Sequence, residues 1–317
     1  MHGSFNTTRH GTSRWPQIAT TLSVGVAATL AVIKGIVWIE SGSVAILGSL
    51  ADSLLDLVAS VIAFFGVRMA AQPPDHNHRF GHGKAEAISS LVQLVLLTGV
   101  AVFVFIEAVQ AVMNPEPIQQ AGAAKAVMIV SIVLTAILVS VQTYAVRQSA
   151  SMATESDRAH YVGDFLGNAG ILLAVILSAN FGILWADGAA GLAAALFLGY
   201  SVIDIGRRAL PQLMDEELDA DERQRIQEIV QGDPDVQGAH ALRTRQAGNV
   251  RYIQMHVELD PDLSLRVAHK ISDRLEAKLL MAFPGADVIL HADPHGHVEP
   301  HDVYGQRLTV TPAASAG

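Results

Sequence analysis

Six long apolar segments, separated by short polar stretches, occupy the first two thirds of the chain. Each has about 20 residues or more, the length that an α-helix needs to cross the hydrocarbon core of a bilayer. The pattern therefore predicts six transmembrane helices. Their expected bounds are 17–39, 43–70, 85–112, 124–146, 160–180 and 183–206.

After Pro211 the pattern changes to the shorter periods of a small α/β domain. Asp219 or Asp221 is expected to cap an amphipathic helix that ends before Gly232-Asp-Pro234. Helix, strand, strand, helix and strand follow one another, which predicts a ferredoxin-like, two-layer α+β (αββαβ) domain. The later elements are expected as strands at 240–246 and 250–259, joined by a hairpin turn, a helix at 264–283 and a strand at 287–292.

Basic residues gather at alternate ends of the apolar segments, and the positive-inside rule then places both termini in the cytoplasm. The polar start of the chain lacks the apolar core of a signal peptide, so the first apolar segment is expected to remain as a helix. The predicted domains are a cytoplasmic N-terminal segment (1–16), a six-helix membrane domain (17–208), a cytoplasmic metal-binding α/β domain (209–294) and a tail expected to be disordered (295–317).

The composition supports an integral membrane protein, because half of the residues are hydrophobic and only 16% are charged. Most of the net charge of −9 belongs to residues 209–317, which contain 18 acidic and 10 basic side chains. This acidity argues against a nucleic-acid partner and suits the attraction of cations. There is no cysteine, so any metal site has to be built from His, Asp and Glu.

Two carboxylates, Asp52 and Asp56, lie one helical turn apart within the second apolar segment. A charged side chain at the centre of a membrane helix costs about 2.5–3.5 kcal/mol on insertion scales, so two on one face need compensation. His160 and Asp164 repeat the same spacing at the start of the fifth segment. If the two faces meet, three carboxylates and one imidazole form a ligand set suited to a divalent transition metal such as zinc. The alternative is that each acid is hydrogen-bonded inside the bundle or lies near the interface.

The loop between the second and third segments is rich in Pro, Gly and His. Asp75, His78 and His82 are spaced to surround one metal ion, although a solvated loop with incidental histidines is the alternative. The piece Gly81-His-Gly-Lys84 lacks the pattern of a phosphate-binding loop, so the sequence indicates no ATP site.

Histidines also recur in the predicted α/β domain. Each alone is more often a surface or core residue than a ligand, but with a nearby acid in so small a domain they favour a metal cluster. His295, His297 and His301, in the tail, are interpreted as incidental or weak ligands. Candidate cluster ligands are His240, His256, His269, His291 and Asp293.

Lys34, near the outer end of the first segment, has two interpretations. It could pair with Asp187 at the start of the sixth segment, or its side chain could extend to the membrane interface.

Four motifs make the sequence resemble the cation diffusion facilitator family, and most of all its bacterial zinc and ferrous-iron efflux branch. The resemblance covers about residues 13–294. The motifs are Ala51-Asp-Ser-Leu-Leu-Asp56, Phe80-Gly-His-Gly-Lys-Ala-Glu86, His160-Tyr-Val-Gly-Asp164 and Gly238-Ala-His-Ala-Leu-Arg-Thr-Arg245.

The resemblance implies a role for each group of candidate ligands. Asp52, Asp56, His160 and Asp164 would form the transport site, and Asp75, His78 and His82 a loop site in which His76 leaves the choice of ligands open. His240, His256, His269, His291 and Asp293 would hold a two-metal cluster in a domain that pairs two protomers. Lys84 and Asp215 would make a charge contact that locks the membrane and cytoplasmic parts of the dimer together.

The expected function is therefore proton-coupled efflux of divalent metal ions from the cytoplasm across the bacterial inner (plasma) membrane, by a homodimer that works through alternating access. Zn²⁺ is the first choice, with Fe²⁺ and Cd²⁺ open. A membrane-embedded metal sensor or scaffold without transport is the alternative, and a passive channel would differ by its indifference to a proton gradient. An intramembrane metalloenzyme is disfavoured because the sequence lacks the His-Glu-x-x-His and Gly-x-Ser-x-Gly motifs.

Overall fold

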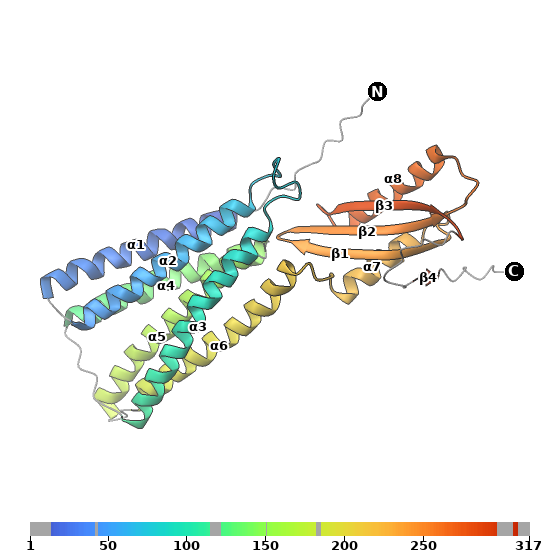
Figure 1. The fold of residues 1–317 in the computed structure, drawn as a ribbon. Helices are drawn as coiled ribbons and strands as arrows, with labels where there is room; N and C mark the ends of the chain where they lie inside the picture. Colours follow the sequence, from blue (N-terminus) through green and yellow to red (C-terminus); the bar gives the residue numbers. More distant parts are fainter. Residues whose placement is uncertain are drawn as a thin grey trace. The chain divides into compact units, whose positions relative to one another are not determined.

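The computed structural model describes residues 14–41, 44–114, 122–149, 151–181, 185–296 and 307–309. The chain divides into two compact units between Leu213 and Met214, and each unit is considered by itself (Figure 1). The prediction of a helical membrane domain followed by a small α+β domain is confirmed.

The first unit consists of long helices, as the six apolar segments require. The last of them runs seven residues past its expected end at 206 and includes Pro211. Proline removes a single backbone hydrogen bond, and near the end of a helix that loss is tolerated. The helices are α1 (Trp15–Ser41), α2 (Val44–Ala70), α3 (Lys84–Met113), α4 (Gly122–Ser149), α5 (Met152–Phe181) and α6 (Ala186–Leu213).

Helix α5 occupies the interior of this bundle. Within the described residues, α1, α2, α3, α4 and α6 contain stretches that are long and apolar enough to cross a membrane. Helix α5 contacts all five of the others, and its first half is largely buried. A helix enclosed by protein can carry polar side chains that lipid would not accommodate. The buried first half of α5 is thus well placed to hold a polar site.

Gly163 lets α6 approach α5 closely beside that polar half. A Cβ atom at this position would overlap the side chain of Leu198. Small residues at such crossings allow helix backbones to pack tightly in a bilayer. This packing fixes the part of α5 that carries His160 and Asp164.

The second unit contains α7 (Ala220–Gln231), β1 (Gly238–Ala247), β2 (Val250–Leu259), α8 (Leu265–Ala282), β3 (Asp287–Pro294) and β4 (Arg307–Thr309). The sheet order is β3-β2-β1-β4; β2 is antiparallel to β1 and parallel to β3, with α8 as the crossover between β2 and β3. The expected hairpin turn between β1 and β2 is present at residues 248–249. Strand β4 was not expected and pairs with β1 at the sheet edge.

Side chains along the strands point alternately to the two faces of this sheet. Ile253, Met255 and Val257 of β2 are buried in a core that also includes Ile226 of α7 and Leu275 of α8. Both helices therefore pack on one face. The residues that alternate with this core point to the opposite face, which the two helices leave uncovered.

Asp233 ties the α7–β1 connection to α8. Its side chain is fully buried and accepts hydrogen bonds from Arg274 Nη2 (2.6 Å) and Nε (3.0 Å) and from Lys278 Nζ (2.8 Å). Burial alone would raise the pKa of Asp233, but these donors outweigh it and hold the pKa below the ordinary 3.8. The resulting stabilisation is present above the ordinary pKa and is lost as pH falls through the lower folded value.

Asp233→Asn is expected to destabilise the second unit by about 1–3 kcal/mol, because it removes the charge that three donor atoms share. Hydrogen exchange of α8 amides in the intact protein measures this loss. Asp235→Asn is the control, since the side chain of Asp235 is half-exposed and, among these residues, bonds only Arg274, while the hydrogen bond from its backbone N–H to Asp233 is kept in the variant. Equal protection in wild type and Asp233→Asn, at neutral and at acidic pH, would contradict the prediction.

Candidate metal centres

The first candidate centre lies where α2 meets α5 inside the helical unit. Asp56 comes from α2, and His160 and Asp164 come from one face of α5. Nε2 of His160 lies 2.7 Å from Oδ1 of Asp56 and 3.8 Å from Oδ2 of Asp164. The three side chains thus offer ligand atoms that all lie within 4.8 Å of one another.

Burial makes this arrangement costly without a cation. The His160 side chain is 8% exposed and that of Asp56 14%. Oδ2 of Asp164 is buried and, within the described part of the chain, takes part in no hydrogen bond. A buried carboxylate oxygen without a donor is destabilising, and a bound cation or a proton would compensate it.

Asp52 lies outside this group of three. It is one turn before Asp56 on α2, and its side chain is exposed. The spacing that predicts two acids on one face is present, but the structure gathers only the second of them with His160 and Asp164. The fourth position of the predicted ligand set remains a prediction.

A buried polar network next to this centre was not anticipated from the sequence. Asp157, one turn before His160, is fully buried. It accepts hydrogen bonds from Ser60 Oγ (3.2 Å) and Gln142 Nε2 (2.8 Å), and Ser60 also bonds the hydroxyl of Tyr161 (2.8 Å). The signal was available, because an acid so close to an apolar segment requires partners.

The loop between α2 and α3 gathers the second candidate group. Asp75 Oδ1 lies 3.1 Å from His78 Nδ1, and Asp75 Oδ2 lies 3.4 Å from His82 Nε2. His82 is buried, and its Nδ1 atom has no hydrogen-bond partner among the described residues. The three predicted ligands are therefore close together, while Nδ1 of His76 lies 3.4 Å from Arg79 Nη2 instead.

The turn that forms this loop also favours the charged form of Asp75. The backbone N–H of His78 donates to Oδ1 (2.6 Å) and is the main cause that lowers the pKa of this carboxyl below its ordinary value. The His78 imidazole and the backbone N–H of Asn77 contribute in the same direction. An ionised carboxylate beside two imidazoles is a suitable set of ligand atoms for zinc.

The third candidate group lies on the uncovered face of the sheet in the second unit. His240, His256 and His291 occupy paired positions on β1, β2 and β3, so they form one row across the strands. Asp293 lies two residues further along β3, on the same face. The strand register thus brings together residues that are more than 50 positions apart in the sequence.

Asp293 is the shared partner in this row. Its Oδ2 atom lies 2.8 Å from His256 Nδ1 and 3.6 Å from His240 Nε2, and its Oδ1 atom lies 3.1 Å from His291 Nε2. Asp293 and His240 are buried, whereas the His291 side chain is 62% exposed. One carboxylate that faces three imidazoles could bridge two metal ions.

A β-bulge in β1 adjusts His240 relative to the rest of that strand. The register shifts between His240 and Arg243, and Ala241 has a positive φ of 51°. Bulges of this kind redirect a side chain at the cost of local strain. No sequence pattern announces this bulge, because alanine rarely adopts a left-handed backbone conformation.

Glu258 is a further member of this face that sequence analysis missed. Its Oε1 lies 3.1 Å from His240 Nδ1, and its Oε2 lies 2.9 Å from His295 Nδ1. Gly238, opposite Glu258 in the register, leaves room for this carboxylate, since a Cβ there would lie 3.0 Å from it. The alternation of His256 and Glu258 along β2 was the available signal. Glu258 is placed to orient His240, as carboxylates do for metal-bound histidines.

One predicted ligand and one predicted charge contact lie outside these groups. His269, on α8, has a side chain that is 74% exposed and pairs with Asp273 on its own helix (3.7 Å), so its role as a ligand remains a prediction. The contact between Lys84 and Asp215 would join the two units and also remains a prediction.

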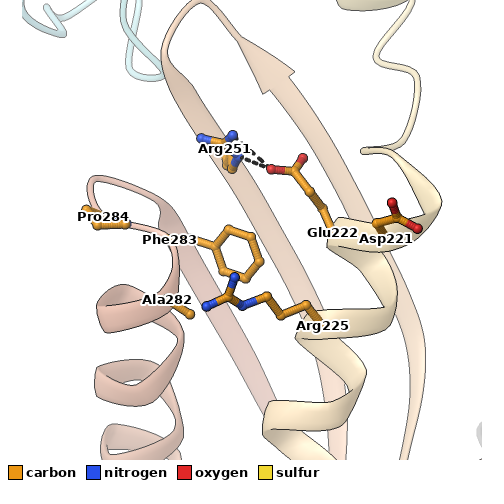
Figure 2. Close-up of a pocket in the computed structure, with 7 residues that line it drawn as sticks. All are labelled: Asp221, Glu222, Arg225, Arg251, Ala282, Phe283 and Pro284. Carbon is orange, nitrogen blue, oxygen red and sulfur yellow. Dashed lines mark hydrogen bonds and ion pairs between the residues drawn. The ribbon is translucent and has the colours of Figure 1, made fainter.

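A hollow of about 360 Å³ lies elsewhere on the second unit, between α7, β2 and the end of α8 (Figure 2). Arg251 and Glu222 form an ion pair of 2.8 Å at its wall, and the Arg225 guanidinium lies 6.0 Å from the Phe283 ring centre. No histidine is among the residues that line the hollow, and the Glu222 carboxylate is already paired with Arg251. We therefore do not assign a metal to this hollow.

Comparisons with known proteins agree over both units. A family model described as the cation efflux transmembrane domain matches residues 20–214, and one described as the cytoplasmic domain of a cation efflux protein matches residues 218–295. The cation-efflux pump FieF of Shewanella oneidensis is 43% identical over 280 residues, which cover 88% of this chain and 94% of that protein. The corresponding pump of Yersinia pestis (strain Pestoides F) is 40% identical over 282 residues, 89% of this chain and 94% of that protein. A solved structure of the metal-bound C-terminal domain of the CzcD transporter from Thermotoga maritima is 29% identical and covers 25% of this chain and 93% of that domain, with a TM-score of 0.24.

Proposed function

The chain belongs to the cation efflux family, and from this premise we propose that it exports divalent transition-metal ions from the cytoplasm in exchange for protons. The protein would act as a homodimer in the bacterial inner membrane, with both termini in the cytoplasm. Metal cation efflux is also what the names of its relatives describe.

The observation that carries this proposal is the convergence of Asp56, His160 and Asp164 between two helices of the membrane unit. Carboxylates and an imidazole within 4.8 Å of one another are a ligand set for a small divalent ion. Asp52, one turn away on α2, would complete a set of four in the loaded state. A site between two packed helices can open to either side of the bilayer when the helices rock.

Exchange with protons follows from the chemistry of these ligands. A metal ion requires a neutral imidazole and ionised carboxylates, so metal and protons compete for the same atoms. Facing the near-neutral cytoplasm, the site would load metal. Facing a more acidic exterior, His160 and a carboxylate would take up protons and release the metal, so the proton gradient would drive export.

Zinc is the metal that this ligand set suits best. Three oxygen ligands and one imidazole match the tetrahedral preference of Zn²⁺. Fe²⁺ and Cd²⁺ are the next candidates; the chain offers no thiolate, the ligand that a softer ion such as Cd²⁺ prefers, and this places Cd²⁺ last. The order that we expect for transport is therefore Zn²⁺ first, with lower rates for Fe²⁺ and Cd²⁺.

The purified full-length protein in liposomes tests the proposal. A pH step across the membrane should drive uptake of Zn²⁺ and produce a matching proton flux in the opposite direction. Flux that ignores the pH step would indicate a channel. Metal binding without any flux would indicate a sensor or scaffold, and either result would overturn the proposal.

The cytoplasmic row of histidines is proposed to be regulatory or structural. Residues 209–317 carry most of the negative charge of the chain, so two copies of this unit repel each other. Metal ions held by His240, His256, His291 and Asp293 would reduce that repulsion and tighten the pair. A contact between Lys84 and Asp215 would then fasten the membrane parts to the paired cytoplasmic parts.

His256→Ala is expected to weaken metal-dependent closure of the two cytoplasmic units, because His256 lies in the middle of the row and binds Asp293 (2.8 Å). Distances between spin labels on the two protomers, with and without Zn²⁺, measure this closure. Gln254→Ala is the matched control, since Gln254 is exposed on the same face of β2. A metal response of His256→Ala equal to that of the control would reject the proposed role.

A further inference from the structure

Lys34 of α1 is a buried cation that the proposed transport cycle does not use. It is 7% exposed, although it lies in a helix apolar enough to span a membrane. Its Nζ atom donates to Ser53 Oγ (2.7 Å) and to the backbone carbonyl of Ser49 (3.0 Å). The sequence suggested a pair with Asp187, whose side chain is outside the described part, or extension to the interface. The second expectation is wrong, because the ammonium group is directed towards α2.

The two acceptors place this ammonium group on a particular face of α2. Ser49, Ser53 and Asp56 follow one another at spacings of four and three residues, and Asp52 lies three residues after Ser49. Residues at these spacings share one side of a helix. Through Ser49 and Ser53, Lys34 therefore meets the side of α2 that carries both acids.

The charges of the four proposed ligands and Lys34 add to a definite value, with Asp157 counted apart because Ser60 and Gln142 already hydrogen-bond it. Three ionised carboxylates with a neutral His160, the states that metal binding requires, carry −3, and a divalent ion alone would leave −1 uncompensated. An ammonium group adds +1, so the deprotonated ligands and Lys34 together carry −2, and one bound divalent ion brings their sum to zero. Net charge inside a membrane is costly, so this match favours occupancy by one divalent ion.

We propose that Lys34 is a fixed internal cation that sets the charge of the site formed by Asp52, Asp56, His160 and Asp164 to the value that one divalent ion neutralises. Lys34 is not a ligand, because a protonated amine has no lone pair. It weakens the attraction for metal enough to permit release, and it disfavours ions of higher charge. This inference rests on the proposed function of the site.

Removal of this charge tests the inference, with metal affinity measured in the purified full-length protein. The background carries His82→Ala and His256→Ala, so that only the membrane centre remains as a candidate. Lys34→Gln keeps an N–H donor for Ser53 but removes the charge. We expect Zn²⁺ to bind roughly tenfold tighter and to be transported more slowly, because one positive charge no longer opposes the ion. Lys34→Arg should resemble wild type.

A trivalent probe separates charge from packing. Since the interaction energy scales with the charge of the ion, a tenfold gain for Zn²⁺ corresponds to a gain of roughly thirtyfold for Tb³⁺. Lys34→Met provides the same readout if Lys34→Gln does not fold. If Lys34 only fastens α1 to α2, both variants should bind both ions more weakly. Unchanged or weaker binding of Zn²⁺ would overturn the inference.

A different result would disprove the proposed function itself. Asp56→Ala in the same background should lose Zn²⁺ binding. If it binds Zn²⁺ as well as its parent, the metal is not held at this centre, and the proposed function itself is wrong. If Asp56→Ala loses binding while Lys34→Gln leaves the affinity unchanged, only the role of Lys34 is rejected.

Discussion

Asp56→Ala is expected to reduce proton-driven Zn²⁺ transport in proteoliposomes by about 100-fold or more. Asp56 provides the only ligand atom from α2 among the three that the structure gathers, and it lies 2.7 Å from Nε2 of His160. Its loss leaves only His160 and Asp164 of α5 among the gathered ligands, with Asp52 alone to contribute from α2, so rocking of the two helices could no longer assemble a complete site. Changes to groups that only support metal ligands already cost about 10–100-fold in affinity or activity, and loss of a ligand should cost more.

The control for this prediction is Glu107→Gln, which removes an exposed carboxylate from α3, another membrane helix. Its transport should remain near that of wild type. Asp52→Ala is expected to lose transport as well, since Asp52 would be recruited as the fourth ligand when metal binds. A fully active Asp52→Ala with an inactive Asp56→Ala would reduce the site to three protein ligands. Near wild-type flux in Asp56→Ala would remove the basis of the proposed function.

Local patterns accounted for the helices and for much of the candidate site. Hydropathy located the membrane segments, and the spacings between Asp52 and Asp56 and between His160 and Asp164 are local properties of a helix. Sequence analysis also marked the fifth segment as a carrier of polar ligands. It did not reveal that α5 contacts all the other helices of the bundle, because that arrangement depends on packing between distant segments.

Long-range relations were the part that the sequence did not determine. The open face of the cytoplasmic sheet follows from alternation, but the row of His240, His256 and His291 depends on strand register and on a bulge. Glu258 was missed although it alternates with His256. For Lys34, the expected extension to the interface was wrong, because hydropathy gives its depth in a helix but not the direction of its side chain.

Asp157→Leu is expected to have the largest effect on the stability of the membrane unit, about 3–5 kcal/mol. Asp157 is fully buried and links three helices, because it accepts hydrogen bonds from Ser60 of α2 and Gln142 of α4. An apolar side chain removes the acceptor that both donors share, so Ser60 keeps only its bond to Tyr161 (2.8 Å) and Gln142 only its bond to Ser23 (3.0 Å). Loss of a buried partner costs about 1–3 kcal/mol for each group. The melting temperature in detergent, followed by size-exclusion chromatography, should fall clearly below that of wild type.

Asp157→Asn separates the contribution of hydrogen bonding from that of charge. The amide keeps one acceptor oxygen, so we expect a loss of about 1–2 kcal/mol, smaller than for leucine. Ser140→Ala is the control, because Ser140 is exposed on α4 and bonds only the carbonyl of Ala136 in its own helix (2.8 Å). The network also anchors α5 one turn before His160, so Asp157→Leu should weaken Zn²⁺ binding at the centre while Ser140→Ala does not. If Asp157→Leu were as stable as Ser140→Ala, the buried carboxylate would not hold the bundle together, and the position of His160 would have to depend on helix packing alone.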